Sequence, residues 1–295
     1  MLPAPLALAV SVRVEPAAAL TIEGEQADAR SAELARAVCA ELSVPDTVRI
    51  DASGDLPAGA GLGSSAAFEV ALARALRSLY SLRLDERDLA LACHRAENRI
   101  VRCGVMDQLC SALAPADGAL MIDCASLATT EVALPGGIEF AVLDSQARHD
   151  NAAGGYEERR AECDEAARLL GVELLCRDLP DGAPEVDALP PPLPARVMHV
   201  LYESAAVRAV VDAFEVGNLE GAALFMRGSH ISQRERFEVS TPEVDALVER
   251  AEAAGALAAR LTGGGFGGAV LAMCNAGEAK AIADAANAPL LATVG

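Results

Sequence analysis

The chain has 295 residues, 52% of them hydrophobic, and a formal net charge of -19 at pH 7. The length allows two domains with sizeable cores, and the negative charge excludes nucleic acid and acidic membranes as expected partners because it repels both. The eight cysteines form no C-x-x-C pair and no apolar run is long enough to cross a bilayer, so we expect a cytoplasmic protein, and we expect a monomer.

The first elements predict a sheet and a helix. Residues 6–14 are apolar and β-branched, and residues 18–23 follow as the expected partner strand. The apolar spacing within residues 31–42 predicts a helix. Residues 47–50 then form a short strand that leads to a glycine-rich loop.

This loop, residues 57–66, reads Pro-Ala-Gly-Ala-Gly-Leu-Gly-Ser-Ser-Ala and runs directly into a helix predicted over residues 64–80. Glycines let backbone N–H groups close on an anion, and a helix N-terminus adds its positive dipole end, so the loop predicts a phosphate cradle. Ser64 and Ser65 add hydroxyls that can cap the helix or ligate a metal carried by the phosphates. The alternative is a plain helix start without a ligand.

The absence of lysine from this loop excludes two other phosphate-binding arrangements. Lys280 is the only lysine of the chain and lies far from the loop in sequence. A P-loop places a lysine directly after its last glycine, and a protein kinase uses a lysine on a strand, so neither arrangement fits.

Glu97 lies near the end of a helix that Asp85 caps and that extends to about Arg99. A carboxylate at a helix C-terminus opposes the helix dipole. A neighbouring arginine (Arg95, Arg99 or Arg102) or a bound cation would offset this, and the sequence leaves both open.

Asp107 lies on the first turn of a short helix that residues 103–108 open and that is predicted to extend to about Ala114. The apolar residues of this helix fall on one face, and Asp107 points away from that face. The dipole keeps such a carboxylate ionised, which suits a proton acceptor or an anchor for an arginine or a hydroxyl. A plain dipole partner is the alternative.

The second half of the chain predicts further strands and several helices. We place the domain boundary between the strands expected at 118–122 and 138–143, giving domains 1–130 and 131–295. We expect the proline-rich segment at 179–194 to be an exposed connector. The elements expected here are strands at 118–122 and 138–143, helices at 156–170, 195–214 and 219–229, a helix from Thr241 to about Gly255, and a proline-rich segment at 179–194.

A glycine string at residues 263–268 satisfies the pattern G-x-G-x-x-G. A dinucleotide-binding fold requires a helix directly after this pattern. Residues 269–273 are instead small, apolar and compatible with a strand, so the string predicts a hairpin between two strands.

Four stretches together resemble the GHMP kinases: the loop at 57–66, Arg-Ala-Glu-Asn at 95–98 followed by Cys-Gly-Val-Met-Asp-Gln at 103–108, Leu-Met-Ile-Asp-Cys at 120–124, and the glycine string with Leu261 and Thr262. The string Gly-x-Met-Asp-Gln is typical of the galactokinase branch, and the resemblance extends from Leu2 to about Ala285. It implies an N-terminal α/β domain and a C-terminal ferredoxin-like domain that bind ATP and a sugar.

The implied reaction is the phosphorylation of galactose at its anomeric hydroxyl by ATP with Mg²⁺. The alternatives are a kinase for another sugar, such as N-acetylgalactosamine, arabinose or a uronic acid, and a non-catalytic protein that binds nucleotide or sugar. By resemblance, Asp107 faces the accepting hydroxyl as the catalytic carboxylate, and Ser64, Ser65 and Glu97 hold the metal. The nucleotide-binding residues are Pro57, Gly59, Gly61, Leu62, Gly63, Ser64, Ser65 and Ala66, and the sugar-binding residues are Gly104, Asp107, Tyr156, Gly264 and Gly265.

The sequence departs from the family pattern in two places. The link from Glu97 to Asp107 is about two residues shorter than usual. The family also carries an opening motif whose arginine steadies the transferring phosphoryl group, and here residues 1–3 align just after the point where that motif should end. We therefore expect a chain that is truncated at its N-terminus and poorly active as written. Arg148, Arg159 and Arg160 are the candidates for a substitute arginine.

Overall fold

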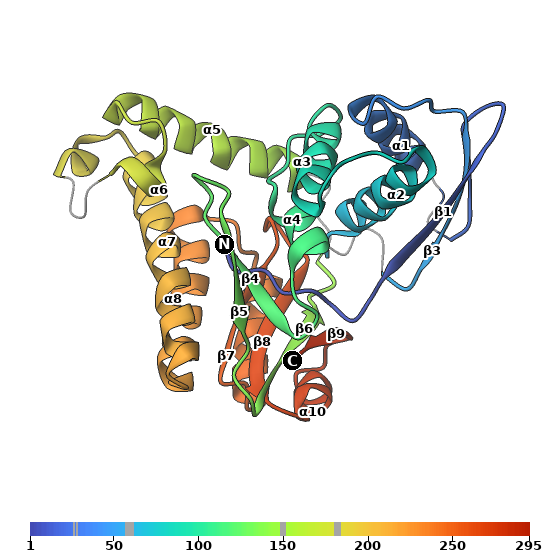
Figure 1. Cartoon of the computed structure of the whole chain (residues 1–295). Helices are drawn as coiled ribbons and strands as arrows, with labels where there is room; N and C mark the ends of the chain where they lie inside the picture. Colours follow the sequence, from blue (N-terminus) through green and yellow to red (C-terminus); the bar gives the residue numbers. More distant parts are fainter. Residues whose placement is uncertain (26, 28, 57–61, 148–151, 180–183) are drawn as a thin grey trace. The chain divides into compact units, whose positions relative to one another are not determined.

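The computed structural model describes the chain except residues 26, 28, 57–61, 148–151 and 180–183 (Figure 1). The chain forms two compact units: the first unit is residues 3–120, and the second unit is residues 1–2 together with 121–295. Helices and strands are mixed in both units, which confirms the expected α/β class. The division into domains at residues 130 and 131 stays a prediction.

In the described part of the first unit, β1 (Val10–Pro16), β3 (Val48–Gly54) and β2 (Thr21–Glu23) form a sheet in the order β1-β3-β2. β1 is antiparallel to β3, and β2 is parallel to it. The expectation that residues 18–23 pair with the first strand is therefore wrong. β3 takes the centre because its alternate side chains are fully buried, so that it is covered on one face and hydrogen-bonded along both edges.

The helices of the first unit follow the predicted boundaries closely. They are α1 (Ala29–Glu41), α2 (Ser64–Tyr80), α3 (Glu86–Glu97) and α4 (Met106–Leu113). The predicted cap is confirmed, since Asp85 accepts a 2.7 Å hydrogen bond from the backbone N–H of Asp88. Residues of α1, α2, α3 and β3 form one apolar core, and this core fixes the helices that carry Glu69 and Glu97.

The second unit contains a sheet in the order β7-β8-β6-β9, made of β6 (Ile138–Asp144), β7 (Ala258–Thr262), β8 (Ala269–Asn275) and β9 (Leu290–Val294). β4 (Gly118–Ile122), whose first residues still belong to the first unit, pairs with β5 (Thr129–Ala133). The glycine string joins the antiparallel strands β7 and β8, so the predicted hairpin is confirmed and the dinucleotide motif is excluded.

The helical segments of the second unit include the predicted helices and several that the sequence analysis did not name. α7 and α8 lie side by side (Figure 1). The described segments are α5 (Ala152–Leu170), α6 (Leu175–Asp178), the 3-10 helix η1 (Pro184–Ala188), α7 (Leu193–Glu215), α8 (Leu219–Ser232), the π-helix η2 (Gln233–Phe237), α9 (Pro242–Ala253) and α10 (Ala279–Ala285).

The proline-rich segment is less exposed than expected. Its apolar residues Val186, Leu189 and Leu193 are buried in a cluster with residues of α5 and α7. α7 starts two residues before the predicted position, with Pro194 in its first turn, where a missing N–H costs no hydrogen bond. Apolar residues between the prolines thus anchor the described part of this segment.

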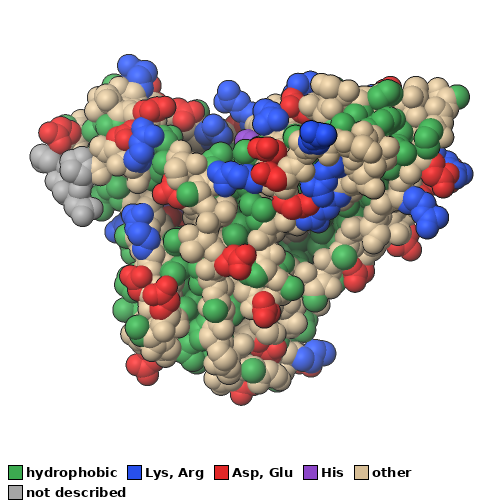
Figure 2. Space-filling view, in the orientation of Figure 1, with side chains coloured by type: hydrophobic (Ala, Val, Ile, Leu, Met, Phe, Trp, Pro, Cys, Tyr) green, Lys and Arg blue, Asp and Glu red, His purple; other side chains and the backbone are tan. Residues whose placement is uncertain are grey.

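The surface carries acidic and basic side chains next to one another (Figure 2). In the first unit, Arg95 and Arg99 both pair with Glu41, with Arg95 at 3.0 Å. Among the helices that the structure describes, none is both long enough and apolar enough to cross a membrane.

Candidate active site

The phosphate loop is described from Leu62 onward, and its predicted contacts Pro57, Gly59 and Gly61 lie outside the described residues. Gly63 is the N-cap of α2, with a φ of 72° that favours glycine, and the helix start has no side-chain cap. Ser64 and Ser65 therefore do not cap α2. They occupy its first turn and are half-buried.

Asp107 lies next to the end of this loop. A Cβ atom built on Gly63 would lie 3.3 Å from both Cγ and Oδ2 of Asp107. Asp107 lies on the first turn of α4, as expected, and is exposed. The structure thus brings the predicted base to the glycine that ends the predicted phosphate cradle.

Glu97 is almost fully buried, at 6% exposure, and its carboxylate is held by side chains from other segments. Gln108 donates from Nε2 to Oε2 of Glu97 at 2.7 Å, and the thiol of Cys103 donates to the same oxygen at 3.3 Å. Arg30 lies 3.5 Å from Oε1 of Glu97. Two of the arginines proposed from sequence to offset Glu97, Arg95 and Arg99, pair with Glu41 instead.

Glu69 is a second buried carboxylate in this place, and the sequence analysis missed it. It is fully buried on α2 and accepts a 3.2 Å hydrogen bond from Nε2 of Gln108. Gln108, at 1% exposure, therefore bridges Glu69 and Glu97 with one amide nitrogen. The available signal was a carboxylate set among the apolar residues Phe68, Val70 and Leu72, since charged residues are rarely fully buried without a partner.

These carboxylates shift one another's affinity for protons. Burial and, second, the charge of Glu97 raise the pKa of Glu69 to about 8, against the hydrogen bond from Gln108 and the charge of Arg30. The protein around Asp107 removes part of its hydration and, together with the Glu97 charge, raises the pKa of Asp107. Burial and the charge of Glu97 thus act in the direction opposite to the helix dipole, which by itself favours the ionised form of Asp107.

Such an arrangement fits a divalent cation. Oε1 of Glu69 and Oε1 of Gln108 are buried without a hydrogen-bond partner among the described residues, and the half-exposed Arg30 lies 3.5 Å from Glu97. Carboxylate and hydroxyl oxygens are the ligands that Mg²⁺ prefers, and it often binds one or two carboxylates together with phosphates. The described residues do not by themselves form a cluster of three ligands, so phosphate oxygens would complete the shell.

Gly104, the remaining predicted sugar contact of the first unit, is exposed in the turn before α4. The neighbouring Cys103 has its pKa raised to about 12 by burial and by the charge of Glu97. The thiol therefore stays protonated and serves as a hydrogen-bond donor to Glu97.

The predicted contacts Tyr156, Gly264 and Gly265 belong to the second unit and are brought together there. A Cβ atom on Gly264 would lie 3.7 Å from Cδ2 of Tyr156, and a Cβ atom on Gly265 would lie 2.6 Å from Cβ of Val239. Phe266, which the sequence analysis did not single out, packs its ring on Gly155, where an added Cβ would lie 2.5 Å from the ring.

The candidates for a substitute phosphate-binding arginine have different surroundings. Arg148 lies outside the described residues. Arg159 is buried and pairs with Glu158, Glu162 and Glu238. Arg160 is exposed and lies 3.9 Å from Asp164. Three carboxylates thus hold Arg159 in a structural position.

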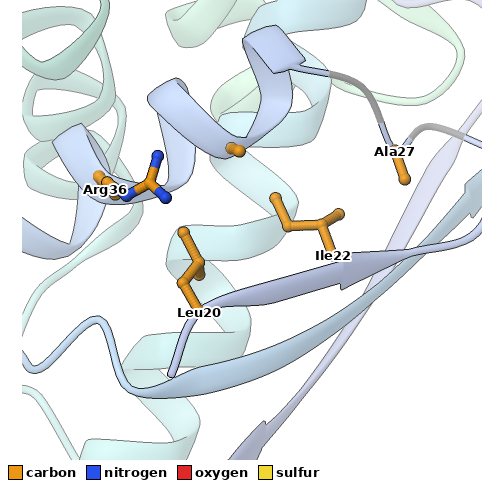
Figure 3. Close-up of a pocket in the computed structure, with 5 residues that line it drawn as sticks. Leu20, Ile22, Ala27 and Arg36 are labelled. Atoms are coloured by element: carbon orange, nitrogen blue, oxygen red, sulfur yellow. The ribbon is translucent and has the colours of Figure 1, made fainter.

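A cavity of about 260 Å³ opens in the first unit between β2 and α1 (Figure 3). Leu20, just before β2, and Ile22 of β2 point toward α1, and Ala27, Ala32 and Arg36 complete the lining. No predicted site residue lines this cavity, so it is separate from the carboxylates of Asp107, Glu97 and Glu69.

Comparison with known families defines the class of protein. Residues 30–114 match the GHMP kinases N terminal domain and residues 210–290 match the GHMP kinases C terminal domain. The chain therefore belongs to the GHMP kinase family.

Within this family the chain is similar to galactokinases. It is 40% identical over 239 residues to the galactokinase of Pasteurella multocida and 39% identical over the same length to that of Actinobacillus succinogenes. Each alignment covers 78% of this chain and 62% of the relative, so the chain matches less than two thirds of these galactokinases.

Solved structures share the fold. The galactokinase of Lactococcus lactis complexed with galactose superposes with a TM-score of 0.88 at 23% identity, covering 97% of this chain and 82% of that chain. The mevalonate kinase of L. major in complex with R-mevalonate gives a TM-score of 0.72 at 17% identity, covering 97% and 84%.

Proposed function

We propose that this protein transfers the γ-phosphoryl group of ATP to the anomeric hydroxyl of galactose, giving galactose 1-phosphate and ADP. The observation that carries the proposal is the position of α4, which places Asp107 against Gly63 and Gln108 on Glu97. The 40% identity to a galactokinase supports galactose as the substrate, and a galactokinase with the same fold was solved with galactose.

Each carboxylate has a separate role in this proposal. Asp107 accepts the proton of the anomeric hydroxyl while the oxygen of that hydroxyl forms a bond to the γ-phosphorus. The bond from that phosphorus to the bridging oxygen of ADP breaks at the same time. Its raised pKa makes Asp107 a stronger base than an ordinary aspartate. Glu97, with Ser64 or Ser65, would hold Mg²⁺, which when bound neutralises charge on the phosphates.

The remaining residues bind rather than react. The backbone N–H groups of the glycine loop and of the first turn of α2 would bind phosphate oxygens. The proposed nucleotide contacts are Leu62, Gly63, Ser64, Ser65 and Ala66, together with Pro57, Gly59 and Gly61. Gly104, Tyr156, Gly264 and Gly265 would line the sugar site. We further propose a monomer in the cytoplasm, where the free cysteines stay reduced.

The test is ADP release by the purified protein with Mg²⁺, ATP and a panel of sugars, with the phosphorylated product identified by ³¹P NMR. We expect turnover with galactose and a product phosphorylated at the anomeric position. Turnover with only N-acetylgalactosamine, arabinose or a uronic acid would identify a different sugar kinase. Binding of nucleotide or sugar without turnover would identify a non-catalytic binder.

A further inference from the structure

The side-chain amide of Gln108, which bridges Glu69 and Glu97, has its nitrogen directed toward both carboxyl groups. The Gln108 nitrogen carries two hydrogens, and the two groups nearest to it are carboxylate oxygens, Oε2 of Glu97 at 2.7 Å and Oε2 of Glu69 at 3.2 Å. A flipped amide would place its carbonyl oxygen against the carboxylate of Glu97. Glu97 therefore selects one orientation of the Gln108 side chain, and in that orientation Oε2 of Glu69 accepts from the same nitrogen.

The bridge joins three helices. Glu69 lies on α2, Glu97 on the last turn of α3 and Gln108 on the first turn of α4. Ser65 lies one turn before Glu69 on α2, and Asp107 immediately precedes Gln108. The helix that presents the proposed base thus also carries the residue that holds the proposed metal ligand.

Stability alone does not account for this network. It is fully buried yet incompletely satisfied, since Oε1 of Glu69 and Oε1 of Gln108 have no partner among the described residues. A buried polar group without a partner is costly, and an apolar side chain of similar size, such as methionine, would avoid that cost at either position. The network therefore has a use other than stabilising the core.

We propose that Glu69 and Gln108 are positioning residues for Glu97. Glu69 holds the carboxamide of Gln108, and Gln108 in turn fixes Oε2 of Glu97, so that Oε1, which Arg30 faces at 3.5 Å, is the oxygen that would bind the cation. This inference rests on the proposed function, because it assigns Glu97 to the metal. Replacing a residue that hydrogen-bonds to a metal ligand typically lowers metal affinity by about 10-fold to 100-fold.

The test measures metal binding without turnover. Mn²⁺ serves as the probe, and free Mn²⁺ is quantified by EPR while it is titrated into the whole chain with saturating ADP at fixed pH. We expect Gln108→Met to raise the Mn²⁺ Kd at least about tenfold. Glu69→Met should raise it at least about threefold, whereas Glu69→Gln, which can still accept the hydrogen bond from Gln108, should stay within about twofold of wild type.

Leu72→Ala is the matched control, because Leu72 is a fully buried residue of α2 outside the network. It should lower the melting temperature while leaving the Mn²⁺ Kd unchanged, which separates positioning from stability. If Gln108→Met does not fold, the comparison of Glu69→Met with Glu69→Gln decides. Equal Mn²⁺ Kd values for folded Glu69→Met and wild type would overturn this inference but leave the proposed function standing. An equal loss of Mn²⁺ affinity in Glu69→Met and Glu69→Gln would do the same. A wild-type protein that binds no Mn²⁺ with ADP overturns the proposed function and the inference with it.

Discussion

The carboxylate of Asp107 lies against Gly63, so that a Cβ atom on Gly63 would lie 3.3 Å from Cγ of Asp107. Gly63 has a left-handed φ of 72° and is the N-cap of α2, and Asp107 opens α4. The close approach depends on glycine twice, for the backbone conformation and for the space that the carboxylate occupies.

Gly63→Ala should therefore lower both stability and activity. The left-handed conformation costs about 1 to 2 kcal/mol for a residue with a Cβ atom, and the tight contact should shift Asp107 and lower kcat for galactose at least about fivefold. Gly171→Ala is the control, because Gly171 has a φ of 68° and no neighbour within 4 Å of an added Cβ. Equal kcat values for the two variants would show that the contact with Asp107 has no catalytic role.

Asp107→Asn should abolish sugar phosphorylation while leaving the affinity for ATP within a few-fold of wild type. Asparagine keeps the shape of the side chain but cannot accept the proton, and a positioned base contributes about 10² to 10⁴ in rate. Asp117→Asn, at an exposed position after α4, is the control. More than about a tenth of the wild-type kcat in Asp107→Asn would contradict the assigned role, and a change confined to KM would make Asp107 a positioning group.

Glu97→Gln should raise the Mg²⁺ concentration required for half-maximal activity, because a neutral amide is a weaker ligand for a hard cation than a carboxylate. Glu41→Gln is the matched control, since Glu41 is a carboxylate of the same unit that pairs with Arg95 and Arg99. An unchanged Mg²⁺ titration in Glu97→Gln would leave Glu97 as a buried partner of Arg30.

Glu69 should make the stability of the protein depend on pH. Its pKa is raised to about 8 in the folded state, so the folded protein retains a proton that the unfolded chain has already released. The stability that this provides is complete below the unfolded pKa of about 4.5 and is lost as pH rises through about 8. Between pH 6 and 8 the loss is at most about 2.7 kcal/mol.

Glu69→Gln should remove this dependence, because glutamine does not titrate. Thermal unfolding between pH 6 and 9, with a chelator present, measures it. We expect the melting temperature of wild type to fall more steeply with pH than that of Glu69→Gln, and parallel curves would argue against a proton on Glu69.

Gly155→Ala should disturb the second unit around Tyr156. An added Cβ would lie 2.5 Å from the ring of Phe266, whose backbone N–H donates a 2.6 Å hydrogen bond to the carbonyl of Val239. We expect the KM for galactose to rise about threefold or more, because the ring has to move and Tyr156 follows Gly155 directly. Gly154→Ala, in the same helix and with no neighbour within 4 Å, should leave KM unchanged. The same KM in both variants would argue against Tyr156 as a sugar contact.

Sequence alone determined the features that depend on neighbouring residues. The start and end of α2, the cap at Asp85, the first-turn position of Asp107 and the glycine hairpin between β7 and β8 follow from local capping, periodicity and glycine content. These signals act within a few residues and need no knowledge of the rest of the chain.

Only the tertiary structure decided which distant groups meet. In the structure β3 lies between β1 and β2. Glu97 pairs with Arg30 and accepts a hydrogen bond from Gln108, whereas Arg95 and Arg99 pair with Glu41. Glu69 is buried and also contacts Gln108. The tertiary structure also raised the pKa of Asp107 where the helix dipole alone predicts the opposite. The physical reason is that strand order, ion-pair partners and desolvation depend on how whole helices pack, and residues 39 or 67 positions apart carry no sign of that contact in their local sequence.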